Sequence, residues 1–171
     1  MLLAIEQLHG VKGLERVKAA LPEPVRAQLG SILPVQWYPI EVSAHVHVAV
    51  RDVLGGGKWD ASHRLGIEAS RIDFTGLYRV LIRAVQYDTI WDRAERAWNQ
   101  YNSQGDARWI ERGEDSALGV IRGVGGYNMG LWQSVAGRAE GMLRMSGVKA
   151  ASAVVLEGTS TGGRIEALWV P

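Results

Sequence analysis

The sequence contains no cysteine, a single phenylalanine and no long hydrophobic run, and these absences remove whole classes of protein. Without cysteine the chain has no disulfide, no thiolate metal site and no thiol nucleophile. No stretch approaches the roughly 18 apolar residues that a membrane-spanning helix needs. The N-terminal MLLAIEQLHG also lacks the basic segment and the uninterrupted apolar run of a signal peptide. We therefore expect a cytoplasmic protein without a membrane span.

Net charge is almost absent as well. The 19 Lys and Arg residues against 18 Asp and Glu leave a net charge of +1, with both signs interleaved along the chain. Electrostatic attraction to phosphate groups is thus not built into the composition, and we expect no nucleic-acid partner. The 171 residues, 47% of them hydrophobic, are enough for one domain with a buried core.

Hydrophobic spacing predicts a layer of helices over about residues 11–104. Two short helices, separated by prolines, end at Gly30, and a further helix covers residues 61–72. The clearest amphipathic pattern in the chain runs over residues 74–85. An aromatic helix capped by Asp88 completes this layer.

The pattern changes over about residues 105–170, where it predicts a hairpin, a helix and a second hairpin. ARWIERGEDSALGVIRGVGG is β-leaning and punctuated by glycine, and ASAVVLEG and RIEALWV flank the turn TSTGG. Asn128 is placed to cap a long helix that ends at Gly147. The order predicts a single α+β domain over residues 1–171, with helices packed on one antiparallel sheet built from hairpins after residue 105.

The stretch EVSAHVHVAV leaves its secondary structure open and carries two histidines two positions apart. On a strand, His45 and His47 would leave the same face and could share a metal ion. On a helix they would point to nearly opposite sides. Alternating valines favour the strand, whereas Pro39 at a first helical position and Glu41 in a first turn favour the helix.

Four segments carry a family resemblance: GLERVKAALPEPVRAQLGSILPVQWYPIEV, RIDFTGLYRVLIRAV, WDRAERAWNQYNSQG and RIEALW. Together, from about Gly10 to Trp169, they resemble a myxobacterial paralogous family of uncharacterised proteins, distantly similar to the 4-vinyl reductase domain and to the Bet3-type subunits of TRAPP-like tethering complexes. The resemblance implies an apolar interior cavity and a helix over residues 40–54. His45 and His47 would then face different ways. Relatives carry cysteines around the last hairpin, which this chain lacks, so we expect no metal site there.

No segment matches a catalytic motif. GVGGYNMG resembles a dinucleotide-binding turn but fails its glycine spacing, and no G-x-S-x-G elbow marks a nucleophile. The acidic pair Glu114 and Asp115 is typical of a solvated loop. We predict that the protein is not an enzyme and has no catalytic residue, metal or cofactor, with an enzyme kept as the least favoured reading. Gly137 and Gly141 are expected to allow close packing against the sheet.

The aromatic residues are the candidate ligand-binding set. A packed core is their simplest interpretation; the functional one is a cavity lined for an apolar small molecule or acyl chain. The leading hypothesis is therefore a non-enzymatic sensory or accessory domain that binds a hydrophobic small molecule or lipid tail. The alternative is a homodimeric structural or protein-interaction module with a filled core and no ligand. The candidate residues are Trp37, Tyr38, Phe74, Tyr78, Trp91, Trp98 and Tyr101.

Overall fold

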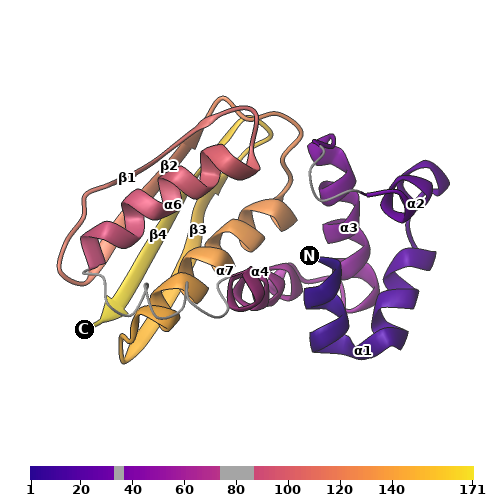
Figure 1. The fold of residues 1–171 in the computed structure, drawn as a ribbon, viewed down its shortest axis with the longest axis horizontal. Helices are drawn as coiled ribbons and strands as arrows, with labels where there is room; N and C mark the ends of the chain where they lie inside the picture. Colours follow the sequence, from indigo (N-terminus) through magenta and orange to yellow (C-terminus); the bar gives the residue numbers. More distant parts are fainter. Residues whose placement is uncertain (33–36, 74–86) are drawn as a thin grey trace.

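The computed structural model describes residues 1–32, 37–73 and 87–171. Its N-terminal part is helical and its C-terminal part combines a sheet with two helices (Figure 1). The elements are α1 (Leu2–Ala19), α2 (Glu23–Gly30), α3 (Ile40–Val53), α4 (Asp60–Asp73), α6 (Tyr87–Tyr101), β1 (Asp106–Ile110), β2 (Ser116–Arg122), α7 (Met129–Ser146), β3 (Ala150–Gly158) and β4 (Gly162–Val170).

The sheet has four antiparallel strands in the order β1-β2-β4-β3, and α6 and α7 lie across one of its faces (Figure 1). The predicted α+β architecture of hairpin, helix and hairpin is confirmed. So is the capping of α7, because the Asn128 side chain accepts a hydrogen bond from the Leu131 amide and Gly147 ends the helix with a φ of 98°. The helix predicted over residues 74–85 lies outside the described residues.

Helix α3 settles the conformation of the histidine pair. It begins at Ile40 directly after Pro39 and carries Glu41 in its first turn, which satisfies both local helix signals. His45 is exposed and its Nδ1 lies 2.7 Å from the Glu41 carbonyl oxygen, whereas His47 is buried. The predicted helix over residues 40–54 is confirmed, and the two imidazoles do face different ways.

Helix α1 differs from the sequence expectation at its start. The hydrophobic spacing predicts a helix from about residue 11, but α1 already begins at Leu2 and passes through a kink at Gly10, where φ is 69°. A positive φ is accessible to glycine at little cost, so Gly10 permits the chain to change direction between two helical segments. Among the helices in the described ranges, none combines the length and the apolarity needed to cross a membrane.

Two hydrophobic cores form on opposite sides of α4 and α7. The aliphatic core fills the N-terminal helical layer, and its buried members among the described residues are all aliphatic. The aromatic core fills the space between the sheet and helices α6 and α7. The buried aromatic side chains of that second core are Trp91, Trp98, Trp109, Tyr127, Trp132 and Trp169.

Glycines bring α4 and α7 into close contact, so these two helices form the seam between the cores (Figure 1). A Cβ on Gly137 would collide with the His63 carbonyl, and one on Gly66 with the Ser134 carbonyl. The expectation that Gly137 and Gly141 pack against the sheet is therefore wrong. They face α4, because the sheet side of α7 is occupied by large side chains such as Trp132.

Candidate functional site

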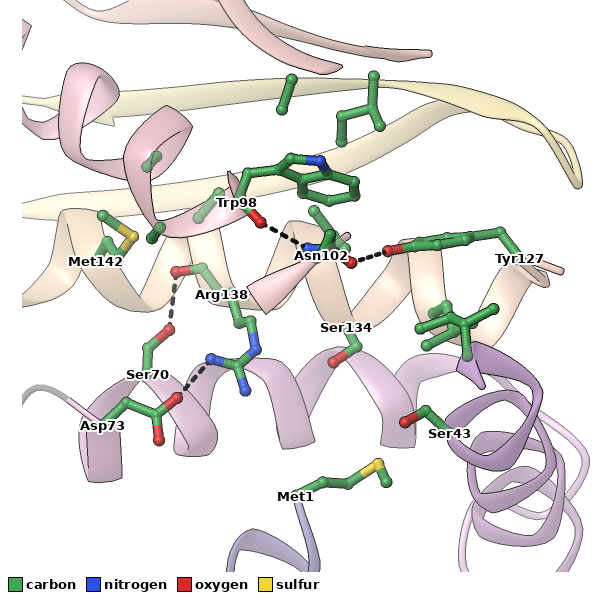
Figure 2. A pocket seen from close by; sticks show the side chains of 18 of the residues that line it. Met1, Ser43, Ser70, Asp73, Trp98, Asn102, Tyr127, Ser134, Arg138 and Met142 are labelled. Atoms are coloured by element: carbon green, nitrogen blue, oxygen red, sulfur yellow. Dashed lines mark hydrogen bonds and ion pairs between the residues drawn. The ribbon is translucent and has the colours of Figure 1, made fainter. Parts of the chain in front are cut away.

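A cavity of about 290 Å³ lies where the seam, the aromatic core and α3 meet. Its wall is mostly apolar and is built from α3, α4, α6, α7 and the inner face of β1 and β2 (Figure 2). Ligand sites in proteins are concave, mainly apolar and carry a small number of placed polar groups. The chemistry of this cavity therefore depends on which polar side chains its wall contains.

On one wall, a short chain of hydrogen bonds links Trp98 to Tyr127 through Asn102. The Asn102 amide donates to the Trp98 carbonyl at 3.1 Å, and the Tyr127 hydroxyl donates to the Asn102 side-chain oxygen at 3.1 Å (Figure 2). Burial raises the pKa of Tyr127 to about 12, so this phenol stays protonated at neutral pH. The indole Nε1 of Trp98, in contrast, is buried without a hydrogen-bond partner. The unused donor of Trp98 is therefore itself buried.

A second polar group joins the two helices of the seam. Arg138 on α7 donates to the Asp73 carboxylate on α4 at 2.7 Å, and the Ser70 hydroxyl donates to the Arg138 carbonyl at 3.0 Å (Figure 2). Arg138 is the one basic side chain among the described residues that line the cavity. Because it is already paired with Asp73, these two residues together add no net charge to the wall.

The third group, which we call the polar end, consists of Ser43 and His47 on α3 and Ser134 on α7. His47 is only 2% exposed, and its Nδ1 lies 3.0 Å from the Ser62 hydroxyl. Burial, with smaller contributions from nearby positive charges, lowers the pKa of His47 to about 4, so the ring is neutral at neutral pH. Its bond to Ser62 uses Nδ1, which leaves Nε2 as the nitrogen available to a ligand.

The structure brings only part of the predicted aromatic set to this cavity. Trp98 lines it. Trp91 is instead packed in the aromatic core, stacked 4.0 Å from Trp109. The inward orientation predicted for Trp37 is wrong, since this side chain is 59% exposed just before Pro39. Tyr38 is partly buried, and its hydroxyl donates to the Ser31 carbonyl.

Three predicted residues receive no structural assignment. Phe74 and Tyr78 lie outside the described residues. Tyr101 ends α6, and its side chain is likewise not described. Whether any member of the aromatic set binds a ligand stays a prediction. The polar cavity-lining residues that the sequence reasoning missed are Ser43, His47, Ser70, Asp73, Asn102, Tyr127, Ser134 and Arg138.

Helical spacing contains the signal that could have identified several of these residues. Ser43 and His47 are four positions apart on α3, and Ser134 and Arg138 are four positions apart on α7. Residues at this spacing share one helix face. A polar pair on the same face as apolar neighbours indicates a buried polar site. No such rule, however, indicates that the two faces meet.

Known structures with a similar fold are H-NOX domains. A variant Fe(II) unliganded H-NOX protein from K. algicida matches with a TM-score of 0.68 and 8% identity, over 99% of this chain and 92% of that one. An oxygen-binding H-NOX domain related to soluble guanylate cyclases matches with a TM-score of 0.64 and 11% identity, over 98% and 90%. A variant H-NOX from T. Tengcongensis matches with a TM-score of 0.63 and 9% identity, over 98% and 92%.

These comparisons correct the family expectation drawn from the sequence. No protein-family model matches the chain, and no curated protein matches it. The expected relation to a myxobacterial paralogous family, to 4-vinyl reductase and to Bet3-type subunits is wrong, because the matching folds are H-NOX domains. Helices beside an antiparallel sheet are common to many folds, so local patterns did not distinguish between these architectures. The chain has the α+β fold of H-NOX domains.

Proposed function

We propose that this protein is a non-enzymatic sensory or accessory domain that binds a mainly apolar small molecule in the cavity at the seam. The observation that carries the proposal is the cavity itself. It has about 290 Å³ of space, an apolar wall and a small set of polar side chains from α3, α4 and α7 and from the segments after α6 and before α7. A ligand held there would contact the aromatic core and polar side chains of α3, α4 and α7, so its binding could be sensed where these helices meet.

The fold supports a sensory role. The matching H-NOX structures include an oxygen-binding domain related to soluble guanylate cyclases, and others concern H-NOX activation and the distortion of haem. Small-molecule binding is therefore a known use of this fold. Because a fold hosts many functions, the argument for this chain still rests on its own cavity.

Thermal unfolding with added ligands tests the proposal. A ligand that binds only the folded state at 100 times its Kd stabilises it by about 2.7 kcal/mol. For a chain of this size, each kcal/mol raises Tm by roughly 2–4 °C. We expect at least one member of a panel of fatty acids, acyl-CoA and aromatic compounds to raise Tm. The variant Ala97→Trp, which fills the cavity, should lose that response. No shift with any compound would contradict the proposal.

The second candidate function, self-association, is favoured by the outer face of the sheet, which is the face opposite α6 and α7. Strand register places four exposed apolar side chains there: Ile110 (44% exposed), Val154 (47%), Leu168 (43%) and Val170 (50%). Exposed apolar patches of this kind mark interaction surfaces. The partner that fits is a second copy of this chain.

Charge complementarity supports that partner. Arg164 and Glu166 are two positions apart on β4, so both side chains lie on the outer face. A two-fold axis between them would bring Glu166 of each copy to Arg164 of the other. Sedimentation should then show a dimer that either Arg164→Glu or Glu166→Arg disrupts and the double variant restores. A native chain that stays monomeric at all concentrations would exclude this function.

A further inference from the structure

Haem is the ligand that the fold family implies, and the described residues do not suit it. A cavity of about 290 Å³ falls at the low end of ligand sites, which span roughly 300–1,000 Å³. A haem also carries two propionates, and the only basic side chain on the described wall, Arg138, is already paired with Asp73. Both the size and the charge of the wall therefore disfavour haem.

The possible iron ligands among the described lining residues lead to the same conclusion. Protein haem is held by His, Cys, Met with His, or Tyr. The chain has no cysteine, and its four histidines all precede residue 64, so neither α6 nor α7 supplies an imidazole. Tyr127 is a protonated phenol bonded to Asn102. His47 is the only imidazole on the wall; it is 2% exposed and its Nδ1 is bonded to the Ser62 hydroxyl, so Nε2 of this one ring is the single imidazole nitrogen that could reach an iron.

The polar groups of the same wall suit a different kind of ligand. Among the described lining residues, His47 is neutral, Arg138 and Asp73 cancel, burial lowers the pKa of the Met1 α-amino group, and the other polar side chains carry hydroxyl or amide groups. Burying a charged group without a partner is costly, so such a wall selects against ions. The Ser43 and Ser134 hydroxyls on this wall can each donate to or accept from one hydroxyl or carbonyl group on a ligand.

We infer that the cavity takes an uncharged, compact and mainly apolar molecule with one hydroxyl or carbonyl group, held at the polar end by Ser43, His47 and Ser134, and that it does not take haem. This inference rests on the proposed function, since it specifies the ligand of the same cavity. The apolar part of the molecule would pack beside Trp98, and its polar group would replace water at the polar end.

Three compounds with one ring system separate the possibilities: naphthalene, 2-naphthol and 2-naphthoate. Calorimetric titration of the full chain should show 2-naphthol binding about fivefold tighter than naphthalene, the ordinary net effect of one hydrogen bond. 2-Naphthoate should bind at least tenfold more weakly than 2-naphthol, because Arg138 is already paired with Asp73 and burial lowers the pKa of the Met1 α-amino group, which disfavours its charged form. Titration with haemin should produce no stoichiometric Soret band.

Substitutions at the polar end test whether these residues cause the difference in affinity between 2-naphthol and naphthalene. Ser134→Ala and Ser43→Ala should each weaken 2-naphthol binding several-fold and leave naphthalene binding unchanged. Ser146→Ala on the same helix α7 is the matched control, because that hydroxyl donates to the Leu143 carbonyl away from the cavity. Circular dichroism establishes that each variant is folded before its affinity is compared.

Each outcome distinguishes this inference from the proposed function. If naphthalene binds as tightly as 2-naphthol, or if 2-naphthoate binds best, the cavity accepts ligands but the assigned ligand class is wrong. A stoichiometric haemin complex also overturns the inference and leaves the sensory function standing. If none of the three naphthalene compounds binds and haemin does not bind either, the inference fails, and the proposed function fails with it when the thermal panel also shows no shift.

Discussion

The two cores of this molecule are built from different kinds of side chain. The aliphatic core holds Ala, Val, Leu and Ile from the first four helices and from the connection between α1 and α2, whereas the aromatic core stacks indoles between the sheet and helices α6 and α7. Trp91 lies 4.0 Å from Trp109 and 5.7 Å from Trp169, measured between ring centroids. The polar groups and the cavity lie at the boundary between the cores.

This difference distinguishes aromatic side chains that only pack in a core from those that could also contact a ligand. Most of the described tryptophans stabilise the sheet half, and two of them, Trp98 and Trp109, also line the cavity. Function in this chain therefore depends less on the number of aromatic residues than on where the two cores fail to fill the space between them.

The largest effect should come from removing a central indole. Trp91 is 1% exposed, so Trp91→Ala should lower the free energy of unfolding by about 3–5 kcal/mol. Trp98→Ala should cost less, because one side of that indole already faces the cavity. Urea unfolding of both variants measures the difference. Equal losses would show that Trp98 is packed as fully as Trp91 and would remove the distinction between core and cavity wall.

The next effect is a dependence of stability on pH. The folded pKa of His47 is about 4, below its ordinary value of 6.5. Above pH 6.5 the ring is neutral in both states and adds no pH dependence. As pH falls from 6.5 to about 4, the unfolded chain binds the proton first, so the free energy of unfolding should decrease by up to roughly 3 kcal/mol.

The variant His47→Gln isolates this contribution, because it removes the titrating ring from the boundary. Urea unfolding between pH 7.5 and pH 4.5 should show a shallower decline in this variant than in the native chain. His45→Gln, at an exposed position on the same helix, is the control. Identical pH profiles for the native chain and His47→Gln would mean that His47 is not buried as a neutral ring.

A smaller effect tests how closely the cores are joined. A Cβ on Gly137 would meet the His63 backbone, so Gly137→Ala should force α4 and α7 apart and cost about 1–3 kcal/mol. Gly30→Ala is the matched control, since nothing lies within 4 Å of its added Cβ. It should be neutral or slightly stabilising. Thermal unfolding of the two variants compares them, and equal Tm values would contradict the glycine seam.

The smallest effect concerns the start of α7. Asn128 caps the helix through the Leu131 amide and also donates to the Ala44 carbonyl of α3 at 3.0 Å. Asn128→Ala should lower the free energy of unfolding by about 1–2 kcal/mol. Asn128→Ser retains a capping oxygen and should recover part of the loss in the same urea experiment. If Ser is as destabilising as Ala, capping is not the reason for the effect.

Local rules predicted much of this fold. Asn128 and Gly147 bound α7 as capping residues should, and both hairpins follow from alternation and glycine turns. Contacts between elements could not be predicted in this way. Gly137 and Gly141 share one helix face in the sequence, but nothing in their spacing says whether that face meets a helix or a sheet.

The candidate site was harder to predict than the fold, for the same reason. Trp98 was identified because a wide aromatic residue at helical spacing points inward. Trp37 was misplaced because it precedes Pro39 in a connection, where helical periodicity has no meaning. Ser134 and His47 belong to one site only because α3 and α7 meet there, which is a property of the tertiary structure.

The most direct test of the cavity is to record the indole N–H resonances of the full chain by ¹⁵N–¹H correlation spectroscopy during titration with 2-naphthol. Trp98 lines the cavity, whereas Trp91 is stacked in the core and Trp132 donates to the Thr159 carbonyl at 2.8 Å. The account predicts that the Trp98 signal, assigned with Trp98→Phe, shifts while those of Trp91 and Trp132 stay in place. An unchanged Trp98 signal at saturating 2-naphthol, or equal shifts of all three, would contradict it.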